Sequence, residues 1–119
     1  MANRLFDLIV WNKAMDLLVE TYELVALLPK EEKYSLGDQM RRAAVSIPSN
    51  IAEGKARCSS NEFKHFLSVA RGSAAELETQ FLICIRVNYM NEGQLENVLA
   101  LCDEIERMLT SLINNLPSD

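Results

Sequence analysis

The sequence predicts an all-α fold, an antiparallel up-down-up-down four-helix bundle that forms one domain over residues 1–119. Two observations lead to this prediction. Short breaks divide the chain into four helix-length segments, and the apolar residues within them recur at intervals of three and four positions. Strand signals are absent, and short connections favour antiparallel neighbours. A chain of 119 residues has room for one core of normal size, so we expect a single domain.

The first helix is expected from about Arg4 to Leu28 and has a wide apolar face. One stripe contains Phe6, Val10, Ala14, Leu17, Thr21, Leu24 and Leu28, and an adjacent stripe contains Trp11, Met15, Leu18, Tyr22 and Val25. Residues at this spacing share one side of a helix. Two stripes are more than one partner helix covers, so we expect another copy of the chain to cover the surplus around Trp11 and Tyr22.

The second helix is expected to begin near Ser35, after a break at 29–33. Its core positions are Leu36, Met40, Ala43, Ile47 and Ile51. Its second half is the segment SIPSNIAEG at 46–54, in which a proline, two serines and an asparagine interrupt an otherwise ordinary helical pattern.

Pro48 is the unusual residue of this segment. It has no N–H for the carbonyl of Ala44, which costs about 3 kcal/mol in a plain helix interior. We therefore expect a proline kink whose freed backbone groups are bonded by local side chains. The candidates for these bonds are Ser46, Ser49 and Asn50. Gly54 suits a left-handed C-terminal cap.

The third and fourth helices, separated by a break at 88–93, each show an uninterrupted heptad seam. The third places Phe63, Leu67, Ala70, Ala74, Leu77, Phe81 and Cys84 on one side, and the fourth Leu95, Val98, Cys102, Ile105, Leu109, Leu112 and Leu116. Each seam is roughly 30 Å long at about 1.5 Å per residue. Such seams favour lengthwise packing at shallow crossing angles.

Three pairs of polar residues indicate where helices begin. The pairs are Ser35 with Asp38, Ser59 with Glu62 and Asn91 with Gln94. The first member of each pair is expected to accept a hydrogen bond from a free backbone N–H, and the second places an acidic or amide group in the first turn.

Composition and charge disfavour several classes of protein. Apolar residues make up 49% of the chain and the net charge is −5, which argues against general attraction to nucleic acid or anionic membranes. No apolar run approaches the roughly 18 to 20 residues that cross a bilayer, and we expect no secretory signal. The odd, scattered set of Cys58, Cys84 and Cys102 indicates reduced thiols and a cytoplasmic location.

The basic residues concentrate in the middle of the chain. Residues 41–71 contain six basic and two acidic residues, whereas residues 72–119 contain two basic and eight acidic residues. The candidates for nucleic-acid binding are Arg41, Arg42, Lys55 and Arg57. Two interpretations stay open: in a symmetric oligomer they form a ring that contacts phosphates, or they pair with Glu53, Glu76 or Glu78. We favour the second interpretation.

The motifs of the second and third helices resemble those of a known family. SIPSNIAEG is preceded by Gln39, Arg41, Arg42 and Ala43 and followed by Lys55, Ala56 and Arg57, and EFKHFLSVARGSAAELETQF follows at 62–81. Together with FDLIVWNKAMDLL at 6–18, they resemble the bacterial 23S rRNA intervening-sequence proteins over nearly the whole chain.

The resemblance implies a four-helix bundle that assembles into a ring-like homopentamer, in a family whose biochemical role is unsettled. Its members are encoded within insertions in large-subunit rRNA genes or elsewhere in the genome. A related branch, the accessory proteins of diversity-generating retroelements, is similar in fold and binds a reverse transcriptase and nucleic acid through a basic surface. This chain differs from that branch in its acidic total and in a fourth helix without a basic face.

A polar stripe beside the apolar seam of the second helix is the candidate interaction site. Its members are Arg42, Ser46, Ser49 and Glu53, accompanied by Pro48, Asn50 and Gly54. The stripe is interpreted either as a ligand or partner surface or as a kink with a subunit interface, and we favour the interface because small hydroxyl residues let another helix approach closely. Gly72 and Ser73 on the third helix provide a second such position.

Catalytic and metal sites are disfavoured. Glu62-x-x-His65 is half of a di-iron signature, but the other half needs a second histidine and the chain has one. The cysteines lack C-x-x-C spacing, and no P-loop, dinucleotide fingerprint or nucleophile elbow appears. We predict no cofactor and a non-enzymatic homo-oligomeric scaffold or interaction module. The second hypothesis is an accessory protein that binds nucleic acid or a nucleic-acid-processing protein; no membrane partner is expected.

Overall fold

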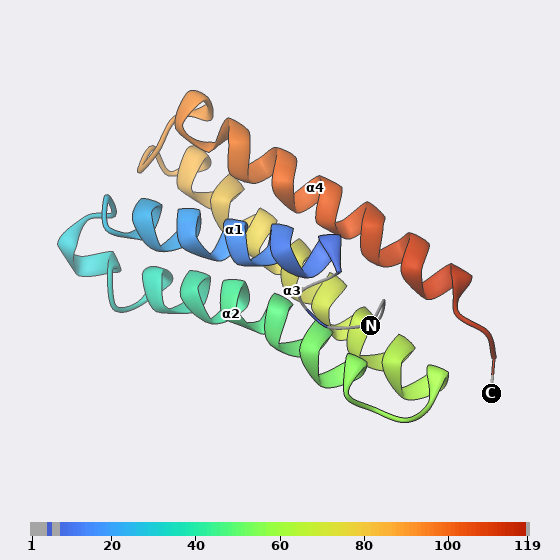
Figure 1. The fold of residues 1–119 in the computed structure, drawn as a ribbon. Helices are drawn as coiled ribbons and strands as arrows, with labels where there is room; N and C mark the ends of the chain where they lie inside the picture. Colours follow the sequence, from blue (N-terminus) through green and yellow to red (C-terminus); the bar gives the residue numbers. More distant parts are fainter. Residues whose placement is uncertain (1–4, 6–7, 119) are drawn as a thin grey trace.

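The computed structural model describes residue 5 and residues 8–118 of the chain. These residues contain the helices α1 (Ile9–Val25), α2 (Leu36–Lys55), α3 (Ser60–Arg86) and α4 (Glu92–Asn115), and a short 3-10 turn, η2 (Lys30–Glu32), lies between α1 and α2 (Figure 1). No strand occurs in this part of the chain. The predicted all-α fold with four helices is therefore confirmed.

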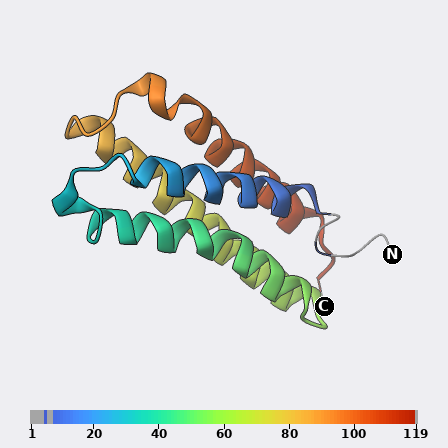
Figure 2. The same cartoon turned by 60° about the vertical axis from the view of Figure 1, so that its left-hand side comes forward.

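The four helices pack side by side along the length of the molecule. α1 packs against α2 and α4, and α3 packs against the same two helices from the other side. Figures 1 and 2 show that the chain reverses at each connection, so that the end of each helix lies beside the start of the next. The result is an elongated body of 46 × 23 × 22 Å. No helix in the described residues is long and apolar enough to span a bilayer.

The core lies between the helices and contains the residues of the predicted seams. In α2 to α4, every seam residue is buried except Leu36, Phe63, Leu112 and Leu116, which are half-buried. In α1, Val10, Ala14, Leu17 and Thr21 are buried. Thr21 donates a hydrogen bond of 2.7 Å from its hydroxyl to the carbonyl of Leu17, so this buried polar group is satisfied.

The first helix is shorter than the sequence predicts. Arg4 and Phe6, which belong to the predicted segment, lie outside the described residues. α1 ends at Val25, yet Leu28 beyond it is still buried at 3% exposure. The apolar pattern therefore continues past the last helical residue, because the chain leaves the helix while its side chains still face the core.

Two of the three predicted caps are confirmed, and one is wrong. The hydroxyl of Ser59 accepts a hydrogen bond from the backbone N–H of Glu62 at 3.1 Å. Asn91 and Gln94 form a reciprocal capping box at the start of α4. Ser35 makes no side-chain cap, and its hydroxyl donates to the carboxylate of Glu32 at 2.7 Å.

The structure revises the account of the SIPSNIAEG segment at one position, Gly54. α2 continues through Pro48 to Lys55, so the proline lies inside the helix; the kink stays a prediction. Gly54 is not a left-handed cap, since no glycine in the described residues has a positive φ. A Cβ on Gly54 would lie 2.8 Å from Cβ of Phe66 and 2.9 Å from Cδ1 of Phe63. Gly54 therefore allows α2 and α3 to approach closely.

Candidate interaction site on the first two helices

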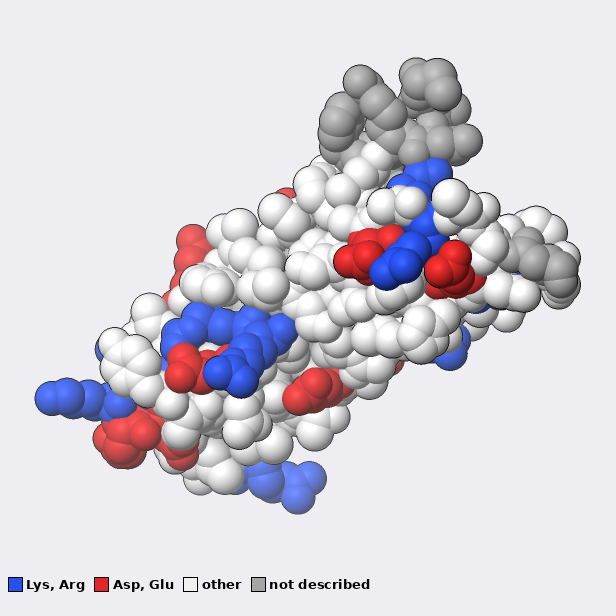
Figure 3. Space-filling view, turned by 90° about the horizontal axis from the view of Figure 1, so that it is seen from below, with Lys and Arg blue, Asp and Glu red and all other residues white. Residues whose placement is uncertain are grey.

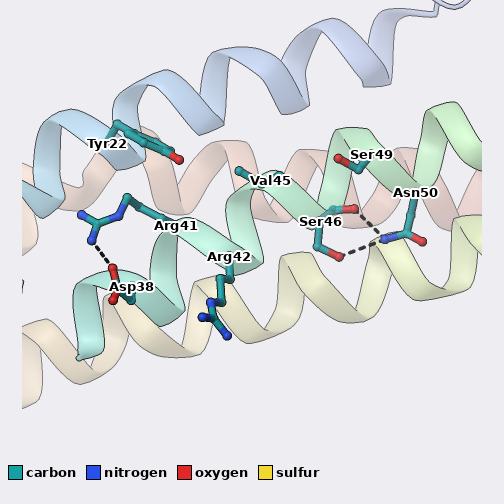
Figure 4. Close-up of a pocket in the computed structure, with 8 residues that line it drawn as sticks. All are labelled: Tyr22, Asp38, Arg41, Arg42, Val45, Ser46, Ser49 and Asn50. Carbon is teal, nitrogen blue, oxygen red and sulfur yellow. Dashed lines mark hydrogen bonds and ion pairs between the residues drawn. The ribbon is translucent and has the colours of Figure 1, made fainter. Parts of the chain in front are cut away.

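The outer surface of α1 and α2 has two adjacent depressions, which together we call the α1–α2 surface. The first, of about 600 Å³, is lined by Tyr22, Asp38, Arg41, Arg42, Val45, Ser46, Ser49 and Asn50 (Figure 4). The second, of about 350 Å³, is lined by Leu5, Trp11, Met15, Leu18, Val45, Pro48, Ser49 and Ala52. Val45 and Ser49 line both, so the depressions form one continuous surface.

The second depression is apolar and includes part of the second stripe of α1. Trp11 and Leu18 are half-buried and pack against the core, opposite the buried Pro48 of α2. Farther along α1, Tyr22 is 46% exposed, and Val45 on α2 is 39% exposed. Of the predicted stripe, only Val25 is fully covered by the chain itself. Part of the apolar face of α1 is therefore exposed to solvent.

Arg41 is held in place by its own neighbours. Its guanidinium donates to the carboxylate of Asp38 and, at 2.9 Å, to the carbonyl of Lys33. The same group lies 6.0 Å from the centre of the Tyr22 ring. The bonds to Asp38 and Lys33 partly neutralise Arg41 and orient it toward α1.

Arg42 differs from Arg41 in having no carboxylate partner among the described residues. Figure 4 shows its side chain pointing away from Arg41 and Asp38. Arg42 is exposed and forms no ion pair with a described residue, and Ser49 is exposed on the same depression. This part of α2 therefore presents a charged donor that is available to an external acceptor.

Ser46 and Asn50 are held by contacts within the chain, and Ser46 joins α2 to α3. The hydroxyls of Ser46 and Ser73 lie 2.8 Å apart, and the amide of Asn50 donates to the carbonyl and hydroxyl of Ser46 at 2.8 and 2.9 Å. These contacts satisfy side chains at a helix–helix contact within one chain. Gly72, by contrast, is exposed, and a Cβ there would meet nothing within 4 Å. Only Ser73 of this predicted pair packs inside the protomer.

Lys55 and Arg57 lie at the other end of α2, more than a dozen residues from Arg42 and thus roughly 20 Å along the helix. Arg57 pairs with Glu53 at 2.8 Å, the partner that the second interpretation named, and lies 3.7 Å from a carboxylate oxygen of Glu62. Lys55 lies 5.9 Å from the Phe63 ring. In Figure 3 the blue side chains on this face form separate groups, most with red side chains nearby. The four candidate cations therefore do not form one patch within a protomer.

Sequence reasoning missed a carboxyl pair between α3 and α4. Burial, with the neighbouring carboxyl of Glu78 and the charge of Asp103, raises the pKa of Glu106 to about 7. Its Oε2 is buried without a hydrogen-bond partner in the described part of the chain. No distinct signal in the sequence marks this pair, because Glu96 and Asp103 also directly follow seam residues and are exposed.

Possible metal ligands and nucleophiles are scattered. No group of three or more His, Cys, Asp or Glu side chains in the described residues is placed to hold a metal ion. His65 is exposed, and its ring lies edge-on to the Phe66 ring with 5.3 Å between the two ring centroids. Cys58 is exposed in the loop between α2 and α3, while Cys84 and Cys102 are buried, and none of the three forms a disulfide. Burial raises the pKa of Cys102 to about 12, which keeps that thiol protonated.

These features define a class: a small four-helix protein with a mixed apolar and basic surface on its first two helices. The sequence profile of the 23S rRNA-intervening sequence proteins matches residues 6–111. The chain belongs to that family, and the resemblance seen in its motifs is confirmed.

A solved structure is similar over most of the chain. It is a crystal structure from Bacteroides thetaiotaomicron VPI-5482, described as a protein with unknown function from the S23 ribosomal protein family. The two chains share 27% sequence identity with a TM-score of 0.84, over 90% of this chain and 100% of the other. No curated protein matches this chain.

Proposed function

We propose that this protein is a non-enzymatic, homo-oligomeric scaffold or interaction module of the bacterial cytoplasm, whose copies meet through the α1–α2 surface. The observation that supports the proposal is the partly open apolar stripe of α1. Tyr22 and Val45 are 46% and 39% exposed, and they continue into the apolar depression beside Trp11. A continuous exposed apolar surface on a small domain indicates a binding surface.

Energetics favour covering this surface with protein. Each Å² of apolar surface removed from water contributes about 25 cal/mol, so covering several half-exposed side chains offsets part of the cost of association. Ser49 and Ala52 are small, which lets a neighbouring helix approach α2 closely. A second copy of the chain can cover this surface without a further partner.

Light scattering tests the assembly directly. We expect a mass that is a multiple of 13.5 kDa, and the resemblance to the family makes five copies the expected number. A mass of one chain at micromolar concentration would contradict the proposal.

Substitutions locate the contact. Trp11→Glu places a charge in the apolar depression and is expected to reduce the mass to that of one chain. Because Trp11 also packs against the core, Ser49→Glu provides a second variant at an exposed position. Val19→Glu is the matched control, since Val19 is 54% exposed but lies in the groove between α1 and α4. Circular dichroism checks that each variant is folded.

A second candidate function is nucleic-acid binding, which the exposed guanidinium of Arg42 favours, since it pairs with no carboxylate in the described part of the chain. If phosphates are contacted, a mobility-shift assay with structured RNA shows binding that weakens steeply with salt. The double variant Arg41→Glu, Arg42→Glu is then expected to abolish the shift. Arg107→Glu is the control, because Arg107 pairs with Asp103 at 3.1 Å on α4, away from α2. Binding without salt dependence, or none at all, would exclude this function.

A further inference from the structure

The α3–α4 pair carries an apolar groove at one end of the bundle. The groove has a volume of about 550 Å³ and is lined by Leu82, Ile85, Arg86, Glu92, Glu96 and Leu99, which we call the α3–α4 surface. Leu82 is 49% exposed there. Glu92 and Glu96 lie one turn apart on α4, and neither forms an ion pair with a described residue. The groove is therefore apolar at its centre and mainly acidic at its rim, with Arg86 as the one base.

This groove lies on the opposite side of the bundle from the α1–α2 surface. α1 and α3 each contact both α2 and α4. The α1–α2 pair and the α3–α4 pair therefore form opposite sides of the bundle. The end of α1, the start of α2, the end of α3 and the start of α4 lie at the same end of the molecule (Figure 1). The depression around Tyr22 and Arg42 and the groove around Leu82 and Glu96 are thus at the same height on opposite sides.

Charge decides how two copies fit together. If the α1–α2 surface met its own copy across a two-fold axis through the depression at Tyr22 and Arg42, Arg42 would approach Arg42, while Asp38 is already paired with Arg41. If the α3–α4 surface met its own copy across an axis through the groove, the four carboxylates of Glu92 and Glu96 would face only the two guanidinium groups of Arg86. Like charges facing each other across an interface disfavour association, whereas opposite charges favour it and set the register. Pairing the two different surfaces places apolar side chains against apolar side chains and arginine near glutamate.

We propose that the α1–α2 surface of one protomer binds the α3–α4 surface of the next, with Val45 and Tyr22 against Leu82 and Leu99, and Arg42 near Glu92 and Glu96. This proposal rests on the homo-oligomeric function proposed above and names its contact. When two protomers make this contact, one α1–α2 surface and one α3–α4 surface of the pair remain free. Further protomers therefore add in the same orientation until the assembly closes. Because the surfaces are at equal height, neighbouring bundles stand side by side.

Complementation between two broken variants tests the pairing. Val45→Asp disables one surface and Leu82→Asp the other, and each variant alone is expected to have the mass of one chain, 13.5 kDa. An equimolar mixture is expected to form a species of two chains, because each variant retains the surface that the other lacks. Val19→Asp is the control and should keep the wild-type mass. A mixture that stays at one chain would overturn the pairing.

Charge reversal gives a test that does not depend on apolar substitutions. Arg42→Glu and Glu96→Arg are each expected to lower the mass at micromolar concentration, and the chain with both changes is expected to regain the wild-type mass. If the wild-type protein is a single chain, the proposed scaffold itself fails. If Leu82→Asp and Glu96→Arg keep the wild-type oligomer, the α3–α4 surface is not in the contact, and only the pairing is overturned.

Discussion

Gly54 lies in the last turn of α2 and Gly72 in the middle of α3, and the two glycines have opposite surroundings. Gly54 faces Phe63 and Phe66 of α3 at distances that leave no room for a methyl group. Gly72 faces open space. Glycine within a helix costs roughly 1 kcal/mol relative to alanine. At Gly54 the close packing against α3 requires a residue without a side chain.

Replacing each glycine by alanine should therefore have opposite effects. Gly54→Ala is expected to lower the free energy of unfolding by about 1–2 kcal/mol, since overpacking exceeds the gain in helix propensity. Gly72→Ala is expected to raise it by roughly 0.5–1 kcal/mol. Urea unfolding followed by circular dichroism measures both. If both substitutions shift the free energy of unfolding equally and in the same direction, the close contact between Gly54 and Phe66 does not determine the effect of Gly54→Ala.

Helix starts differ in how their free N–H groups are satisfied. α4 begins with the Asn91 and Gln94 capping box, with both hydrogen bonds at 2.9 Å. α2 begins after Ser35, whose hydroxyl is engaged with Glu32 instead. The same serine-or-asparagine pattern in the sequence thus corresponds to two different local structures.

Asn91→Ala is expected to destabilise the protein by about 1 kcal/mol, because it removes the cap of α4. Ser35→Ala should change stability by less than about 0.5 kcal/mol, since it removes only an exposed hydrogen bond. The measurement is the urea midpoint at constant m-value. A larger loss for Ser35→Ala than for Asn91→Ala would contradict this assignment of the caps.

The connection after α1 and the connection after α3 are tied together. The phenol of Tyr89 donates a hydrogen bond of 2.7 Å to the carboxylate of Glu32 in η2. Hydrogen bonds from Ser35 and Tyr89 lower the pKa of Glu32. This contact between residues far apart in the chain links two turns at the same end of the bundle.

The contact between α3 and α4 is expected to depend on pH. The pKa of Glu106 is raised to about 7 from its ordinary value of 4.5, so between these values the folded chain holds a proton that the unfolded chain releases. The stability that this proton contributes is complete below pH 4.5, falls as the pH rises and is lost above about 7. Glu106→Gln should remove this dependence.

Urea midpoints at pH 5 and pH 8 measure the effect. Relative to Glu106→Gln, the wild-type protein should lose stability from pH 5 to pH 8. Glu23→Gln, which replaces an exposed carboxylate on α1, is the control and should follow the wild-type profile. If Glu106→Gln and the wild-type protein show parallel profiles, Glu106 does not retain its proton in the folded chain.

At the level of the assembly, small-angle scattering distinguishes one bundle from several. A single chain has a radius of gyration of 14.9 Å over its Cα atoms. The wild-type protein is expected to exceed this value clearly, and Val45→Asp is expected to return to it while keeping its helical spectrum. A wild-type value near 14.9 Å would mean that the half-exposed stripe of α1 stays in water.

Much of the fold was predictable from local pattern. The seams of α3 and α4 were read residue by residue, because a heptad repeat requires only that apolar side chains share one side of a helix. The breaks near Pro29 and Asn88 follow from the chemistry of turns, and Asn88 indeed has a positive φ of 64°. Helix ends were less accurate, since burial of Leu28 continues beyond α1.

The candidate site was predictable in composition but not in arrangement. The motif identified Arg42, Ser46 and Ser49 as a polar stripe, yet Ser46 bonds to Ser73 of α3 while Arg42 and Ser49 face outward. Sequence spacing gives the side of a helix and not what a neighbouring helix places there. Gly54 was misassigned for the same reason, since its neighbours Phe63 and Phe66 belong to α3.

By itself, the sequence determined the number of helices, the residues of their cores and the family, because these depend on periodicity and motif within single segments. The tertiary structure alone decided which surfaces stay open, which arginines are neutralised and that Glu106 lies beside Glu78. Those properties depend on distances between side chains of different helices, which are set only when the four helices pack against one another.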